Sequence, residues 1–470
     1  MLSTASLLIP IVLANTALAT PCQSTIEQHA QVRTSSGLIT GHTAPNTGCV
    51  IEFLGIPYAK PPIGDLRFAP PQKLLTPDLS YNASSFGHDC PSTPSKPVNY
   101  PGFTPQAQRI INYFASATGT PQSEDCLTLN IWTSPSSPRR PKPVLVFFYG
   151  GRFTIGNTNT PFYYGAHLAS TQREFVIVTV NYRLNIFGFP GAPSLPSHSQ
   201  NLGLRDQRLA VEWVRDNIPS FHGDPSKITL AGQSSGGVSV DYWAYAYPND
   251  PIAHGLIAHS GTAFSFPSNT KSIQQSNWDS VVSALSCSPT HDPISCMQKI
   301  PWQTLLSAAS ALKPAYAQGV IPTKKQVDSF LLESFTCPVL YQAKGRRDHG
   351  VPAFVYRYFA DWENTRLYWG SGAYHGVDLH MVFGGAEEVS GGLVMSKEQR
   401  GLMGWVQGAW RAFADNPWDG LRKVGWPRFD TEGKTLAEVV RREKAMVEFV
   451  EVGGYEGGCE GVTMGALGVM

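Results

Sequence analysis

Neither charge is in excess in this sequence, since 36 lysines and arginines face 35 aspartates and glutamates among 470 residues. A nucleic-acid-binding protein needs a basic patch, and a disordered polyanionic tail needs a run of acidic residues. The sequence has no such patch and no such run. We therefore expect no nucleic-acid partner.

Apolar runs of transmembrane length, about 20 residues, are also missing. The run Leu7–Leu13 is too short to span a membrane, and it is followed by the small-x-small pattern Ala17–Ala19. This order is typical of a signal peptide with its cleavage site. We interpret residues 1–19 as a signal peptide and expect a secreted protein without a transmembrane segment. The alternative is a buried strand at the N-terminus.

Repeats, low-complexity linkers and Cys-x-x-Cys pairs are absent as well, so the simplest division makes residues 20–470 one domain. Eight cysteines in a secreted chain indicate disulfides rather than metal ligands. The only N-x-S/T sequon begins at Asn82, which makes this residue a candidate glycosylation site.

Strand and helix patterns alternate in the first half of the chain. The continuous apolar runs 144–148 and 175–180 are typical of strands buried on both faces of a mainly parallel sheet. An amphipathic helix is predicted over 204–215, followed by short strands at 227–231 and 256–258. Strand, helix and strand in this order predict an α/β fold with right-handed crossovers.

The strand at 227–231 leads directly into the G-x-S-x-G motif Gly232–Gly236. In this context the glycines allow a crowded, strained turn that lifts the serine hydroxyl above the sheet edge. Ser234 is therefore the candidate nucleophile. The alternative is a structural serine in a glycine-rich turn. Phe148–Phe153, at the end of an earlier strand, lies where this fold places donors for an oxyanion.

Several further segments carry a resemblance that covers nearly all of the mature chain. They resemble signatures of the type-B carboxylesterase/lipase family, the cholinesterase-like serine esterases, in their secreted fungal form. The resemblance implies an α/β-hydrolase fold, a mostly parallel central sheet flanked by helices, and cleavage of carboxylic esters without metal or cofactor. The segments are Gly55–Ala59, Pro61–Pro62, Leu66–Phe68, Ser123–Asn130, Asn201–Gln207, Ala373–Gly376, Val382–Gly384, Trp410, Phe413–Ala414 and Trp426–Pro427.

The resemblance also implies roles for individual residues. Ser234 attacks the ester carbonyl, and His375 is the general base. The backbone N–H groups of Gly151, Arg152 and Ser235 form the oxyanion hole. The family usually has a glycine where this chain has Arg152, but a backbone donor survives that change. Histidines without a matching context are His254, His259 and His349.

Two disulfides, Cys90–Cys126 and Cys287–Cys296, correspond to the usual pairs of the family. Within the first loop, residues 109–115 have an apolar helical face. In lipases resembling this chain that loop carries a lid over the active site; the alternative is packing on the domain core. The sequence does not pair the remaining cysteines, which are Cys22, Cys49, Cys337 and Cys459.

The third member of a catalytic triad is missing from the pattern. The fold orders its triad as serine, acid, histidine. The interval from Ser234 to His375 is shorter than in the family and holds no convincing acid turn. We expect an acid-bearing stretch with at least one strand to be absent between Lys313 and Ser334, as a faulty gene model or variant transcript would produce. Weak substitutes are Asp348, Asp328 and Glu333.

The sequence thus favours a secreted serine hydrolase acting on a small-molecule or lipid ester. The alternative is an impaired or dead relative that serves as a binding module, since the acid is unassigned. The motifs do not name the ester or the oligomeric state.

Overall fold

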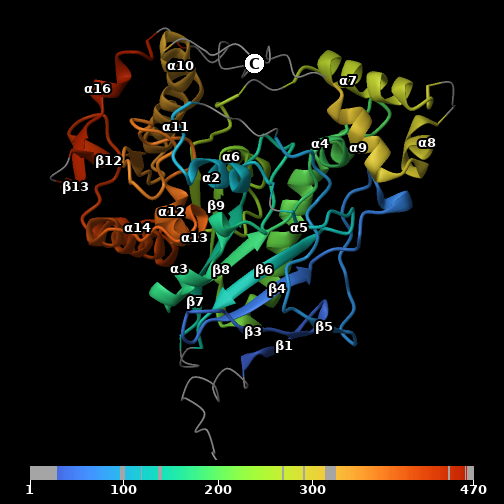
Figure 1. Ribbon diagram of the computed structural model, residues 1–470, viewed down its shortest axis with the longest axis horizontal. Coiled ribbons are helices and arrows are strands. Elements are labelled where there is room, and N and C mark those ends of the chain that lie inside the picture. Colours follow the sequence, from blue (N-terminus) through green and yellow to red (C-terminus); the bar gives the residue numbers. More distant parts are fainter. Residues whose placement is uncertain are drawn as a thin grey trace, which may run out of the picture.

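The computed structural model describes residues 29–95, 101–117, 119–135, 140–266, 269–288, 292–312, 324–442, 445–460 and 462. The predicted signal peptide, residues 1–19, lies outside the described residues. Figure 1 shows a central sheet with helices around it.

The central sheet has seven strands in the order β10-β9-β7-β8-β6-β4-β3. The four strands β10, β9, β7 and β8 are parallel, and β6, β4 and β3 continue the sheet in antiparallel pairs. All four predicted strands are present in the parallel half. The strands are β3 (His42–Thr43), β4 (Ile51–Pro57), β6 (Thr128–Thr133), β7 (Lys142–Phe148), β8 (Val176–Val180), β9 (Gly223–Gln233) and β10 (Gly255–His259).

Every residue of β7 and β8 is buried, because helices cover both faces of this half of the sheet. The predicted amphipathic helix is α5, which contacts β9; α3 and α14 contact one another and the strands β8 and β7. The longer helices are α2 (Ala107–Phe114), α5 (Leu202–Asn217), α6 (Ser235–Ala246), α7 (Lys271–Ala284), α9 (Trp302–Ser310), α10 (Lys324–Leu331), α11 (Cys337–Asp348) and α14 (Lys397–Asp415).

Short helices connect these elements. The α-helices among them are α3 (Ala166–Thr171), α4 (Asn185–Gly188), α8 (Pro293–Lys299), α12 (Leu379–Phe383), α13 (Ala386–Ser390), α15 (Gly420–Lys423) and α16 (Gly453–Glu456). The others are the 3₁₀ turns η1 (Gly64–Leu66), η2 (Pro161–Tyr163), η3 (Ser197–Ser199) and η4 (Ile218–Phe221), and one π-helical turn, η5 (Leu332–Thr336).

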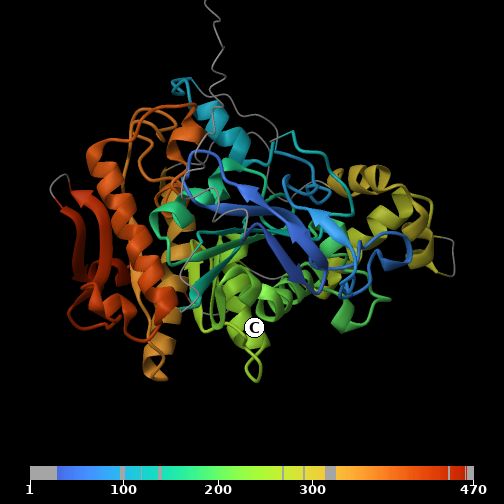
Figure 2. The same cartoon turned by 90° about the horizontal axis from the view of Figure 1, so that it is seen from below.

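Two smaller sheets flank the central one. The first has the order β1-β2-β5, and the second has the order β11-β12-β13. Figure 2 shows β12 and β13 at one end of the molecule and α7–α9 at the other. The strands are β1 (Gln31–Thr34), β2 (Gly37–Thr40), β5 (Ser80–Asn82), β11 (Val355–Tyr358), β12 (Lys434–Arg442) and β13 (Ala445–Glu451).

The central and C-terminal sheets each have an unpaired edge on the same cavity. Among the described residues, β10 pairs only with β9 and β11 pairs only with β12. Residues of β10 and β11 both line one cavity of about 1710 Å³. The sequence predicts a missing stretch between Lys313 and Ser334. Residues 313–323 of this interval are outside the described residues, and the rest forms α10 and the start of η5.

Three disulfides are defined by the described residues. Both predicted pairs, Cys90–Cys126 and Cys287–Cys296, are confirmed. The third, Cys337–Cys459, joins α11 to the C-terminal segment and was not predicted. Cys49 is disulfide-bonded too, whereas Cys22 lies outside the described residues.

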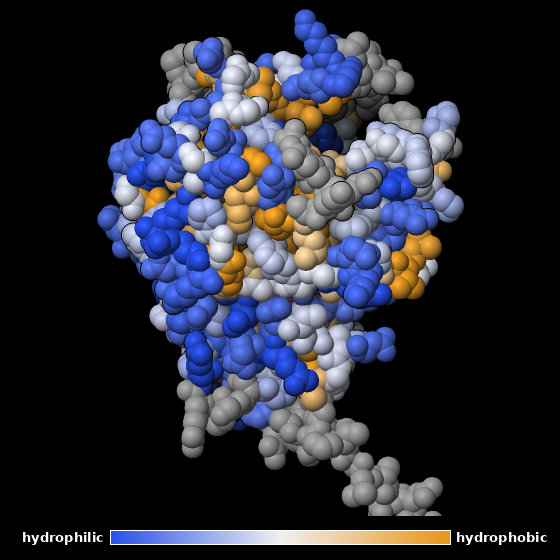
Figure 3. Space-filling model, turned by 90° about the vertical axis from the view of Figure 1, so that its left-hand side faces the viewer, coloured by the Kyte–Doolittle hydropathy of each residue, from blue (hydrophilic) through white to orange (hydrophobic). Residues whose placement is uncertain are grey.

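The described helices include none with both the length and the apolar character needed to cross a membrane. Figure 3 shows the face formed by the C-terminal part of the chain, where polar side chains cover much of the surface and apolar ones emerge between them.

Candidate active site

Ser234 occupies a strained turn between β9 and α6. Its φ of 57° and ψ of −122° lie in a region that a side chain rarely adopts. The surrounding glycines are required by space: a Cβ on Gly232 would lie 2.2 Å from the carbonyl oxygen of Gly236, and a Cβ on Gly236 would lie 2.1 Å from that of Phe148. The backbone N–H of Ser234 donates to the carbonyl oxygen of His259 at 2.8 Å, which fixes the turn to β10.

The predicted oxyanion donors lie on the loop after β7 and at the start of α6. Gly151 and Arg152 have φ values of 118° and 58°, and neither backbone N–H donates to any described residue. Ser235 is the first residue of α6, where an N–H has no acceptor within the helix. The loop passes close to the nucleophile, because a Cβ on Gly150 would lie 2.8 Å from the Cβ of Ser234. The Arg152 side chain is exposed at the cavity.

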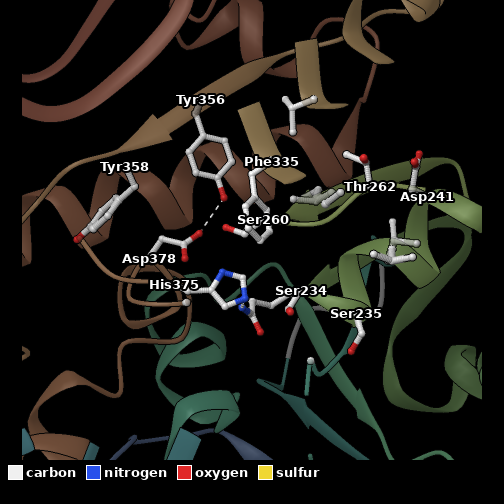
Figure 4. Close-up of a pocket in the computed structure, with 18 of the residues that line it drawn as sticks. Ser234, Ser235, Asp241, Ser260, Thr262, Phe335, Tyr356, Tyr358, His375 and Asp378 are labelled. Atoms are coloured by element: carbon white, nitrogen blue, oxygen red, sulfur yellow. Dashed lines mark hydrogen bonds between the residues drawn. The ribbon is translucent and has the colours of Figure 1, made fainter. Parts of the chain in front are cut away.

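His375 lies in the turn before α12, next to Ser234 in the same cavity (Figure 4). Its ring is packed against two aromatic rings, Phe335 at 5.5 Å and Phe114 at 6.2 Å between centroids. His375 is exposed to the cavity, although protein groups lie close around its ring. Burial lowers the pKa of His375, and the negative charge of Asp378 opposes this shift.

The hydrogen bond on Nε2 of His375 does not come from Ser234. The side-chain amide of Gln233 lies 3.0 Å from that nitrogen, and no hydrogen bond joins Ser234 to His375 in the described structure. An amide nitrogen only donates, so Nε2 is the acceptor and the proton of the neutral ring is on Nδ1. The nitrogen that a general base needs is thus unprotonated, while Nδ1 is left for a carboxylate.

The other histidines have structural contacts. Nδ1 of His349 lies 2.7 Å from the carbonyl oxygen of Gly345 on its own helix, and Nδ1 of His254 lies 2.8 Å from that of Ser226. His259 is fully buried beneath the turn of Ser234 and does not reach the cavity surface.

The three acidic residues considered as weak substitutes for the triad acid are exposed at the surface. Asp348, at the end of α11, pairs with Arg347 and is exposed. Asp328 pairs with Lys324 on exposed α10, and Glu333 is also exposed.

Asp378 places a buried carboxylate next to His375, and the sequence did not predict it. Asp378, three residues after His375, accepts hydrogen bonds at Oδ2 from Nδ1 of His259 at 2.9 Å and from the hydroxyl of Tyr356 at 2.8 Å. Figure 4 shows the carboxylate beside the imidazole of His375. Only its closeness to His375 in the sequence could have drawn attention to it.

The predicted lid helix is present as α2. Ile110, Ile111, Tyr113 and Phe114 line the cavity, so the apolar face covers the site. Ile110 is also part of the main hydrophobic core. No group of three or more His, Cys, Asp or Glu side chains in the described ranges is arranged to hold a metal ion.

Comparison with known proteins identifies the family of this chain. Residues 28–334 match the carboxylesterase family. The chain belongs to this family. Its members and the relatives below are carboxylic ester hydrolases with the α/β-hydrolase fold.

Similar proteins include fungal and animal esterases. Secreted lipase 5 of Gibberella zeae is 30% identical, over 85% of this chain and 88% of the relative. Chlorogenic acid esterase of Aspergillus niger is 30% identical, over 82% of each. Cholinesterase of Mus musculus is 37% identical over 51% of this chain and 38% of its own length.

Proposed function

We propose that this protein hydrolyses carboxylic esters with Ser234 as nucleophile and His375 as general base. The observation that carries the proposal is the strained turn that presents Ser234 to a cavity shared with His375 and with the N–H groups of Gly151 and Arg152. A serine needs a base to be nucleophilic, and the developing oxyanion needs fixed donors.

The reaction follows from these positions. Ser234 Oγ attacks the ester carbonyl and its proton moves to Nε2 of His375, while the carbonyl oxygen takes the negative charge facing the backbone donors. The protonated His375 then gives this proton to the leaving alcohol. Water attacks the acyl-enzyme with His375 as base again, which releases the acid and restores the Ser234 hydroxyl.

One rearrangement must take place before Ser234 attacks the ester. The amide of Gln233 has to leave Nε2 of His375 before Ser234 can bond to it. Hydrogen bonds in free active sites often differ from those in the substrate complex, so this arrangement is compatible with catalysis.

We also propose that residues 20–470 form one secreted enzyme domain. The relatives named secreted lipases, the predicted signal peptide and the disulfides support this. Asn82 is exposed at the end of β5, so a glycan can attach there.

The decisive experiment is labelling with a fluorophosphonate, which reacts only with an activated serine. We expect one labelled residue, Ser234, in the folded wild-type protein, and none in Ser234→Ala. The His375→Gln variant should label far more slowly at an unchanged melting temperature. A folded wild-type protein that takes up no label would instead identify the binding-module alternative.

A further inference from the structure

The buried carboxylate of Asp378 belongs to a hydrogen-bonded group drawn from four elements. Its Oδ2 accepts from His259 on β10 and from Tyr356 on β11. On the far side of His259, the indole N–H of Trp410 on α14 lies 3.4 Å from Nε2 and donates to it. These contacts fix the carboxylate in the turn that also carries His375.

The carboxylate of Asp378 carries the negative charge of this group. An indole only donates, so Nε2 of His259 is an acceptor and the single proton of a neutral ring is on Nδ1, facing Asp378 and Tyr356. In the described structure no lysine or arginine forms an ion pair with Asp378. A buried carboxylate without a cation favours a positive charge that develops close by.

The ionised form of Asp378 is maintained despite its burial. Burial by itself raises the pKa of this carboxyl group, but the hydrogen bonds donated by His259 and Tyr356 oppose this effect, and the pKa lies below its usual value. Tyr356 has its own pKa raised by burial and by Asp378, so its hydroxyl stays protonated and donates.

Three other titratable groups around His375 are neutral. Tyr358 on β11 and Tyr374 are buried, with pKa values raised by burial, and stay neutral. Buried His380 has a pKa lowered to about 4 and is neutral too. Arg152 and Asp241 also line the cavity, but Asp241 forms an ion pair with Arg346 on α11.

We propose that Asp378 is the carboxylate that stabilises protonated His375, in place of an acid between the serine and the histidine in the chain. This inference rests on the proposed function. It makes Asp378 a positioning residue with the chain order serine, histidine, acid.

In the proposed step Asp378 exchanges no proton. The proton of Ser234 moves to Nε2 of His375 as the Oγ–carbon bond forms, and the resulting imidazolium has its Nδ1–H available to the Asp378 charge. When Nε2 protonates the leaving alcohol, the imidazole is neutral again and Asp378 is unchanged.

The test compares Asp378→Asn, which removes the charge at nearly constant shape, with Tyr356→Phe, which perturbs the same group and keeps the charge. For each variant the rate of fluorophosphonate labelling of Ser234 and kcat/KM for p-nitrophenyl acetate are measured from pH 5 to 9, with the melting temperature. We expect Asp378→Asn to lower the pH-independent plateau of both rates on the order of 10²-fold. This is less than the ~10⁴-fold loss of rate when an acid bonded directly to the base is replaced. Tyr356→Phe should lower both rates much less.

The acid limb of the pH profile separates this role from a structural one. Because the Asp378 charge raises the pKa of His375, its removal should move the limb to lower pH. A packing defect would lower the plateau without moving the limb. A plateau within twofold of wild type, or an unmoved limb, would overturn the proposal.

An NMR titration of His375 in the Ser234→Ala protein makes the result independent of catalysis. Adding Asp378→Asn should lower the measured pKa of His375. If it does not, Asp378 does not act on His375, even where wild-type Ser234 is labelled. If Ser234 is never labelled but the pKa moves, the proposed function fails while the electrostatic contact stands.

Discussion

The side-chain amide of Gln233 lies 3.0 Å from Nε2 of His375, the nitrogen that receives the Ser234 proton in the proposed mechanism. The other end of this fully buried amide, Oε1, has no hydrogen-bond partner in the described structure. Gln233 thus makes one hydrogen bond that competes with the proposed proton transfer and leaves one polar atom unsatisfied.

Replacing Gln233 by methionine should therefore speed the reaction of Ser234. Methionine has a similar length and cannot donate to His375, so no hydrogen bond of about 1 kcal/mol has to be broken first. We expect fluorophosphonate labelling about fivefold faster at pH 7. A slower reaction at an unchanged melting temperature would mean that the amide helps to position the imidazole.

The Arg152 side chain should contribute little to turnover. Its proposed role uses the backbone N–H, which Arg152→Gly and Arg152→Ala both keep. We expect kcat to change less than tenfold in each, against about 10²–10³ for loss of an oxyanion donor. A larger loss in both variants would show that the guanidinium contacts the substrate, and an ester with an acidic acyl group should then be tested.

The same pair of variants tests backbone strain. Arg152 has a φ of 58°, which costs a residue with a side chain about 1 kcal/mol and costs glycine nothing. Arg152→Gly should therefore have a higher free energy of unfolding than Arg152→Ala, measured by urea denaturation. Equal values would mean that the loop relaxes without cost.

His380 should make the fold sensitive to acid. Both ring nitrogens are buried and have no hydrogen-bond partner among the residues that the structure describes. Burial, opposed by the charge of Asp378, lowers the pKa of His380 to about 4 from 6.5. Between these pH values the unfolded chain binds the extra proton, so stability falls as pH falls, by about 3 kcal/mol in total.

The variant His380→Leu tests this dependence. Its free energy of unfolding should decline less than that of wild type between pH 6.5 and 4, as measured by urea denaturation. His349→Gln, which changes an exposed histidine, should keep the wild-type slope. Equal slopes for wild type and His380→Leu would contradict the assignment.

The lid interpretation of α2 predicts a difference between substrates. Ile111 and Phe114 line the cavity from above, and Phe114 contacts His375. A lid must be apolar underneath and able to open. The double variant Ile111→Asp/Phe114→Asp should hydrolyse soluble acetate esters as wild type does and lose about tenfold or more on emulsified long-chain esters.

Asn112→Asp is the control for this variant, since it adds charge to the same helix outside the cavity lining. It should spare both substrates. Equal loss on both substrates in the double variant would indicate that α2 is a packing element of the core.

The sequence predicted the elements whose cause is local. The runs 144–148 and 175–180 are typical of strands in a covered sheet. Both are wholly buried, the first within β7 and the second as β8 with the residue before it. Gly232 and Gly236 indicate the tight turn at Ser234, because any other residue at these positions would clash with the neighbouring backbone. The resemblance to known signatures added the pairs Cys90–Cys126 and Cys287–Cys296.

Features that arise where distant segments of the chain pack together could not be predicted from the sequence. Cys337 and Cys459 are 122 residues apart, and only the packing of α11 against the C-terminal segment brings them together. Likewise the isolated sequence segments of β10 and β11 give no sign that both strands end as unpaired edges on one cavity.

The sequence by itself therefore determined the α/β architecture and the tight turn that carries Ser234, since hydrophobic periodicity and glycine-dependent turns depend on neighbouring residues. The proposed base, His375, came from the resemblance to known signatures. Only the tertiary structure decided which groups surround the base. Asp378 owes its fixed, ionised carboxylate to His259 and Tyr356, which come from two other strands. A buried charge is set by its hydrogen-bond partners and by the exclusion of water, and both arise when distant parts of the chain pack together.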